Sequence, residues 1–246
     1  MHAAGYDKEY IEEAIANGLD TLGFSDHAPY VYPDGYVSYY KMVPDELPEY
    51  VSALSHLREI YRGKIDIHIG LEAEYYPPIF DKALELWREN KIEYLILGQH
   101  YINEEWGSAP LHSFAPLGDE ELVLYTDLCI EALHTGYFSA VAHPDLLNYN
   151  GGSSELYARE ARRLIKAAIE TDTPLEYNLL GLRGGRHYPN PSFWREAAKL
   201  SPKVILGCDA HEPESVAYPE NVKMALADLK GYGLTPITEL TLKSIY

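Results

Sequence analysis

Helical and strand-like segments alternate along most of this chain, and this alternation restricts the fold more than any other feature. Residues 7–17 carry apolar side chains at helical spacing and end before Gly18, and the next segment, TLGFSDH, is apolar up to a polar tip. Short apolar segments between amphipathic helices are typical of parallel β/α folds. We expect further helices at 48–61, 80–89, 120–134, 154–171, 192–200 and 219–231, and strands within 64–73, 92–100, 138–145, 173–181 and 203–211. About six strands result, and 246 residues suffice for one α/β barrel domain spanning 1–246.

Composition excludes several functional classes. The formal net charge of −18 argues against general nucleic-acid binding, which requires clustered Lys and Arg. No apolar run approaches the ~18–20 residues of a membrane span, and the first ten residues lack the pattern of a secretory signal, so we expect a cytoplasmic protein. The two cysteines, Cys129 and Cys208, are not in a C-x-x-C pair and are predicted to be reduced, buried thiols.

Residues that can bind metals occur where the predicted strands end. In a parallel barrel the carboxyl ends of all strands open onto one face, where the active site lies, so side chains from distant segments should converge there. Histidine and carboxylate ligands without cysteine suit Zn²⁺, Mn²⁺ or Fe²⁺. The strand-end residues are His27, Glu72, His100, His143, Asn178, Asp209 and His211.

Six motifs in a fixed order carry a family resemblance. They are GFSDHAP, GLEAE, LGQHYI, AHPDL, PLEYNLLGLR and LGCDAH. Together they resemble the polymerase-and-histidinol-phosphatase (PHP) superfamily, most closely its histidinol-phosphate phosphatase branch, from residue 2 to about 215. The resemblance implies a distorted (β/α)7 TIM-like barrel with two or three divalent metal ions. It also implies phosphoester hydrolysis by a metal-bound water or hydroxide.

The resemblance also implies roles for single residues. Glu72 matches a carboxylate that bridges two metals, and His100 and His143 match ligands of the second metal. Asp209 matches a ligand of the first metal. Arg183 matches a phosphate-binding arginine, with Arg186 or His187 as assistants, and Asp209 or a nearby histidine such as His211 is the candidate general acid. The third metal would be bound by His27, His211 and His2.

One motif of the family is absent. The family begins with H-x-H on its first strand, and this chain has no H-x-H. Two explanations stay open: the start of the chain was assigned too late, or the protein lacks this strand and holds fewer metals. The expected fold is therefore the TIM-like barrel with its first strand missing or truncated, and the exposed edge makes a homo-oligomer plausible.

We expect a hydrolase that acts on a small phosphomonoester, with L-histidinol phosphate favoured by the resemblance. Its cationic amine suits an acidic protein. Two alternatives are a broader phosphoesterase or nuclease of the same superfamily, for which a basic track would be expected, and a degenerate metal-binding protein without activity. Two further residues are open: Glu74 as a support for a ligand or a solvated carboxylate, and His112 as a border of the pocket or a loop residue.

Overall fold

The computed structural model describes residues 3–246, which form six strands, eight α-helices and three short 3₁₀ helices. The strands are β1 (Thr21–His27), β2 (Asp66–Ala73), β3 (Tyr94–Leu97), β4 (Phe138–Val141), β5 (Leu175–Asn178) and β6 (Val204–Gly207). The α-helices are α1 (Asp7–Ala16), α2 (Leu47–Ile60), α3 (Phe80–Glu89), α4 (Asp119–His134), α5 (Ser154–Glu170), α6 (Leu179–Arg183), α7 (Pro191–Leu200) and α8 (Pro219–Gly231). The 3₁₀ helices are η1 (Pro33–Gly35), η2 (Pro44–Glu46) and η3 (Pro213–Ser215).

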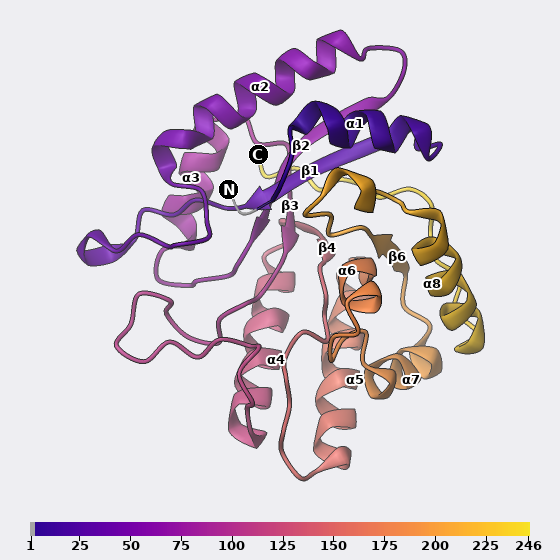
Figure 1. Cartoon of the computed structure of the whole chain (residues 1–246). Helices are drawn as coiled ribbons and strands as arrows, with labels where there is room; N and C mark the ends of the chain where they lie inside the picture. The colour runs from indigo at the N-terminus through magenta and orange to yellow at the C-terminus, as the bar shows by residue number, and fades with distance from the viewer. Residues whose placement is uncertain (1–2) are drawn as a thin grey trace.

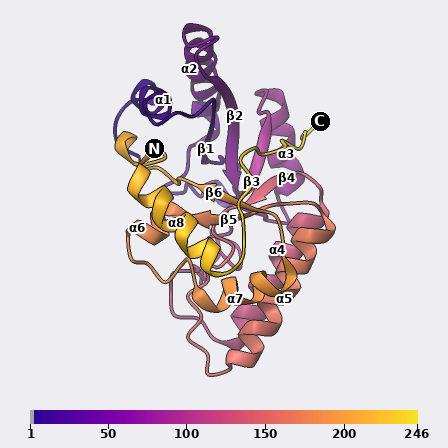
Figure 2. The same ribbon diagram turned by 90° about the vertical axis from the view of Figure 1, so that its right-hand side faces the viewer.

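All six strands are parallel, and their order in the sheet is their order in the chain. A helix lies in every connection between consecutive strands, so the sheet curls with the helices outside it (Figures 1 and 2). No strand ladder joins β1 to β6 within residues 3–246, and the barrel is open between these two strands. The predicted distorted TIM-like barrel with a missing strand is confirmed.

The open side is bridged close to the carboxyl ends of the strands. Helix α1 packs beside η3, the backbone N–H of Ala4 donates to the carbonyl of His211 at 2.8 Å, and Asn17 Nδ2 donates to the carbonyl of Val216 at 2.8 Å. The N-terminal residues described here therefore lie against the segment that follows β6.

The core lies between the sheet and the surrounding helices. Trp87, Trp194 and Phe138 are among its largest fully buried side chains. Every residue of β4 and β5 is buried, as expected for strands of a parallel sheet that is covered on both faces. Within residues 3–246, no helix combines the length and apolarity that crossing a bilayer requires. Cys129 and Cys208 are both free thiols, the first buried and the second half-buried.

The structure corrects one predicted element. The apolar segment 173–181 was expected to continue as a strand, but β5 ends at Asn178 and α6 begins at the next residue. The reason is a local cap: Asn178 Oδ1 accepts a hydrogen bond from the backbone N–H of Gly181 at 2.7 Å. As a consequence, Arg183 is the last residue of α6 and does not lie in the Gly-rich loop that follows.

Candidate active site and metal centre

The strand ends meet around one cavity. It has a volume of about 160 Å³ and lies at the carboxyl ends of the strands. Six of the seven predicted metal ligands line it, and the seventh, His2, lies outside the described residues. The lining residues are His27, Tyr39, Tyr40, Glu72, His100, His112, Phe114, His143, Leu180, Arg186, Tyr188, Asp209 and His211.

The carboxylate of Glu72 lies at the centre of three imidazoles. Its Oε1 is 2.9 Å from His143 Nε2 and 3.9 Å from His100 Nε2, and its Oε2 is 3.5 Å from His27 Nδ1. Parallel pairing sets this arrangement, because His27 is the register partner of Glu72 across β1 and β2. The rings of His27 and His143 both contact the ring of His100 edge to face, each with centroids 5.0 Å apart.

These groups have the chemistry of a metal site. One ligand atom each from His27, Glu72 and His100 lies within 4.8 Å of the others, with nitrogen and oxygen donors and no cysteine. Among the described residues, Glu72 Oε1 is a buried atom without a hydrogen-bond partner of good geometry. Because buried polar atoms are normally satisfied, an additional partner such as a cation fits this position. The resemblance assigned His27 to a separate third metal, whereas here it lies next to Glu72 and His100.

The electrostatics of the cluster match its geometry. Burial by itself would raise the pKa of Glu72, but His27, His143 and His100 hold it well below its usual range. Burial lowers the pKa of His143, but the adjacent Glu72 outweighs this and raises it to about 9. Without a metal, His143 and Glu72 therefore form a buried ion pair at neutral pH.

Two residues of the site have an unusual backbone conformation. His143 has φ of +31° and Asp209 has φ of +43°, in a region that side chains other than glycine rarely adopt. Both follow the last residue of a strand by two positions, so the chain turns sharply there to aim the side chain into the cavity. Such strain is commonly found at functional sites.

Asp209 is connected to a carboxylate that the sequence reasoning did not single out. Asn178 Nδ2 donates both to Asp209 Oδ2, at 3.0 Å, and to Glu176 Oε2, at 2.9 Å. Glu176 also accepts from the backbone N–H of His143 at 2.7 Å. Burial and the nearby Asp209 raise the pKa of Glu176 to about 7. The available sequence signal was its place two residues before Asn178, on the same face of β5.

The three predicted phosphate-binding residues lie in different environments. Arg186 lines the cavity; its Nη1 donates to Tyr188 Oη at 2.6 Å, and its guanidinium lies 5.8 Å from the ring centroids of Phe114 and Tyr188. Arg183 donates to the hydroxyl of Ser215 and is not among the cavity-lining residues. His187 lies outside the lining too, with its Nε2 2.5 Å from the carbonyl of Leu146.

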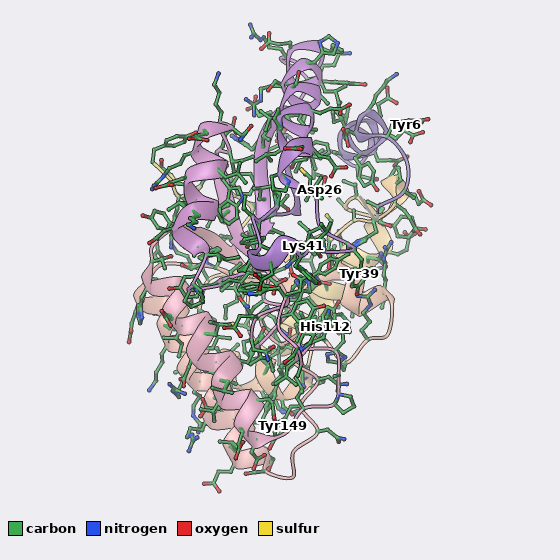
Figure 3. The ribbon with its side chains drawn as sticks, turned by 90° about the vertical axis from the view of Figure 1, so that its left-hand side faces the viewer. Tyr6, Asp26, Tyr39, Lys41, His112 and Tyr149 are labelled. Atoms are coloured by element: carbon green, nitrogen blue, oxygen red, sulfur yellow. The ribbon has the colours of Figure 1, made fainter. Side chains whose placement is uncertain are left out.

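The two open sequence alternatives concerned Glu74 and His112. Glu74 is 1% exposed and pairs with Lys41, so it is not a solvated loop carboxylate. Burial would raise the pKa of Glu74, but Lys41 and His100 hold it well below its usual range. His112 borders the cavity, beside His100 and Phe114. Figure 3 labels His112, Lys41 and Tyr39, which gather around the middle of this view.

Asp209 and His211, the two residues predicted for proton transfer, lie together at the exit of β6. His211 Nδ1 is 3.4 Å from Asp209 Oδ1 and 3.0 Å from the backbone carbonyl of Asp209. Both side chains keep contact with solvent, at 32% and 18% relative exposure for His211 and Asp209. Both side chains line the cavity.

Known proteins are similar to this chain in sequence and in fold. The PHP domain model matches residues 1–179. A probable histidinol-phosphatase of Deinococcus radiodurans is 30% identical over 228 residues, which cover 88% of this chain and 84% of that protein. A histidinol-phosphatase of Bacillus subtilis is 25% identical, over 86% of this chain and 89% of that protein. A crystal structure of histidinol phosphate phosphatase from Lactococcus lactis, complexed with zinc, L-histidinol and phosphate, has a similar fold, with a TM-score of 0.66 at 18% identity over 99% of this chain and 92% of that chain.

Proposed function

The chain belongs to the PHP domain family, and we infer that it is a metal-dependent phosphomonoester hydrolase of the histidinol-phosphatase type. The resemblance found in the sequence motifs is thus confirmed. The observation that carries the function is the carboxylate of Glu72 between three imidazoles at the carboxyl ends of the strands, with Arg186 at the same cavity.

We propose that two or three divalent cations bind here. Glu72, His100 and His143 would hold one, and the remaining ligands are Asp209, His211, His27 and, outside the described residues, His2. Cations at such a site neutralise phosphate charge and acidify a bound water. Zinc is the first candidate, because nitrogen and oxygen donors suit it and a zinc complex exists for the Lactococcus lactis protein.

The chain's own residues would bind and orient the phosphate. The guanidinium of Arg186 can contact two phosphate oxygens at once, which fixes the ester in one orientation. The Phe114 and Tyr188 rings hold this guanidinium at the cavity. Arg183 stays a predicted second phosphate ligand, and it would have to leave Ser215 to reach the cavity. His187 stays a predicted assistant.

Proton transfer to the departing alcohol would fall to whichever of Asp209 and His211 does not bind a cation, because a donor atom that coordinates a metal carries no proton. These side chains line the cavity and are near each other, so a proton can pass to the leaving oxygen and be replaced from solvent. Asn178 holds Asp209 from behind and so limits its rotation.

We propose L-histidinol phosphate as the substrate. The relatives' names support it, and the lining of the cavity includes aromatic side chains, Tyr39, Phe114 and Tyr188, that suit a cationic, ring-bearing leaving group. The net charge of −18 favours a cationic leaving group and disfavours a nucleic-acid substrate. A cytoplasmic location and a homo-oligomer stay predictions.

The test is metal analysis and phosphate release on the same sample, purified without added metal. Wild type should contain two or more equivalents of transition metal and release phosphate from L-histidinol phosphate faster than from a phosphodiester. Glu72→Gln, which keeps the shape and removes the charge, should lose both metal and turnover. Faster cleavage of the diester would favour the nuclease alternative, and metal without any turnover would favour the degenerate binding protein.

A further inference from the structure

Lys41 is a charged side chain buried deep in the loop between β1 and α2. Its side chain is 2% exposed, and its Nζ lies 2.7 Å from Glu74 Oε1 and 2.5 Å from Glu105 Oε2. Nζ also donates to Tyr76 Oη at 3.0 Å and to Tyr32 Oη at 3.3 Å. Burying an ammonium is unfavourable unless its partners are well placed, so this arrangement needs a reason beyond packing.

Aromatic rings enclose the ammonium. Its Nζ lies between 4.9 and 5.9 Å from the ring centroids of five tyrosines, namely Tyr30, Tyr32, Tyr40, Tyr76 and Tyr101. Rings at this distance attract a cation and exclude water. The cage therefore fixes the position of the ammonium.

Glu74 connects Lys41 to the proposed metal site. Its Oε2 accepts the backbone N–H groups of His100, at 3.1 Å, and Tyr101, at 2.9 Å. Its Oε1, which Lys41 contacts, lies 3.6 Å from His100 Nδ1. His100 therefore has Glu74 beside Nδ1 and Glu72 beside Nε2. A carboxylate behind the second nitrogen of a metal-binding histidine is a common way to fix the ring and its tautomer.

We propose that Lys41 is a positioning residue, which acts through Glu74 to hold His100 with Nε2 toward Glu72 and so sets the affinity of the site for its metal. The inference rests on the proposed function. Tyr40 contributes to the same arrangement: its hydroxyl donates to Glu74 Oε1 at 2.9 Å, and its ring lies 4.9 Å from the ring of His27. Glu105 binds the other side of the ammonium and has no contact with His100 among the described interactions.

The experiment compares two neutralised carboxylates that share one lysine. Glu74→Gln and Glu105→Gln each remove one negative charge from Lys41, but only Glu74 reaches His100. Metal-stripped proteins are titrated with Zn²⁺ against a competing fluorescent chelator, and their unfolding in urea is measured in EDTA. We expect Glu74→Gln and Lys41→Met to lose roughly 10- to 100-fold in Zn²⁺ affinity at one site, with kcat lowered and KM little changed. Glu105→Gln should keep the Zn²⁺ affinity, even where it lowers stability in EDTA.

The outcomes separate the two proposals. Equal Zn²⁺ affinities for wild type, Glu74→Gln and Glu105→Gln would overturn the positioning role, and so would a loss in all variants that follows their stability in EDTA. If Lys41→Met does not fold, the Glu74→Gln and Glu105→Gln comparison still decides. Wild type that binds no Zn²⁺ would instead overturn the proposed function.

Discussion

Two glycines leave space for the carboxylates of Glu72 and Glu176. A Cβ at Gly98, directly after β3, would overlap Glu72 Oε1, and a Cβ at Gly207, at the end of β6, would overlap Glu176 Oε1. Both glycines therefore lie where a carboxylate from the preceding strand in the sheet needs the space. The glycines of LGQH and LGCDAH thus have a steric explanation, because any larger residue at either position would displace the carboxylate next to it.

Gly98→Ala should disable the metal site with little effect on the rest of the molecule. The new methyl group would push Glu72 from the centre of the histidines, so we expect metal content to fall and kcat to drop at least about tenfold. Gly231→Ala is the matched control, because a Cβ there meets nothing within 4 Å and its backbone is not in the left-handed region. Elemental analysis and phosphate release check both variants; full metal content and turnover in Gly98→Ala would contradict the central position of Glu72.

The raised pKa of His143 predicts a pH-dependent stability of the metal-free protein. Its pKa is about 9 in the fold and near 6.5 in an unfolded chain. The stabilisation is therefore complete below pH 6.5 and is lost as the pH rises through 9. Urea unfolding in EDTA should show wild type losing up to ~3 kcal/mol relative to His143→Gln between these pH values. If the difference in unfolding free energy between wild type and His143→Gln stays constant with pH, Glu72 does not stabilise the protonated form of His143.

At the scale of the elements, the helices and strands could be predicted from the periodicity of the sequence, whereas the side-chain contacts between them could not. The predicted helices at 80–89 and 219–231 agree with α3 and α8. Helix α3 has a clear apolar stripe, and α8 begins at Pro219, a residue favoured in the first turn of a helix. The strand-end ligands followed from the rule that parallel strands open onto one face. Lys41 and Glu105 were missed because they lie 64 residues apart in loops without periodicity, and only the folded chain brings them together. Helix α6 was missed because its apolar residues continue the pattern of β5.

Asn178 joins two elements to the site, and its two roles can be separated. Its Oδ1 caps α6, and its Nδ2 bridges Glu176 and Asp209. Asn178→Ser keeps a capping oxygen and loses the bridge, so we expect turnover to fall at least about tenfold, with less metal bound. Asn178→Ala loses both and should unfold ~1 kcal/mol more easily than Asn178→Ser. Urea unfolding and kinetics on the pair check this; equal turnover in wild type and Asn178→Ser would show that the bridge has no part in catalysis.

Over the whole molecule, the two ends of the barrel have different tasks. The carboxyl ends of the strands carry the cavity, whereas the C-terminal segment crosses the opposite end, where it contacts three separate elements of the fold. Ile237 donates its N–H to Val204 at 2.7 Å, Lys243 donates to Ser139 Oγ at 2.9 Å, and Arg88 donates to the carbonyl of Ile245. Figure 2 shows this yellow segment passing from α8 toward α3. It thereby ties β6, β4 and α3 together on the side away from the ligands.

Ile245→Ala should separate stability from activity. Ile245 is 0% exposed and belongs to the main core, so its truncation should leave a cavity and cost ~2–4 kcal/mol of unfolding free energy. Because the mutation lies at the end of the barrel without ligands, metal content and kcat/KM should stay at wild-type values while the protein remains folded. Leu226→Ala, on an α8 side chain that is 45% exposed, is the control and should change stability little. Urea unfolding tests the stability, and metal analysis and kinetics at temperatures below the unfolding transition test the site. Loss of metal from Ile245→Ala without denaturant, at a temperature where the variant is folded, would mean that the two ends of the barrel are coupled through the sheet.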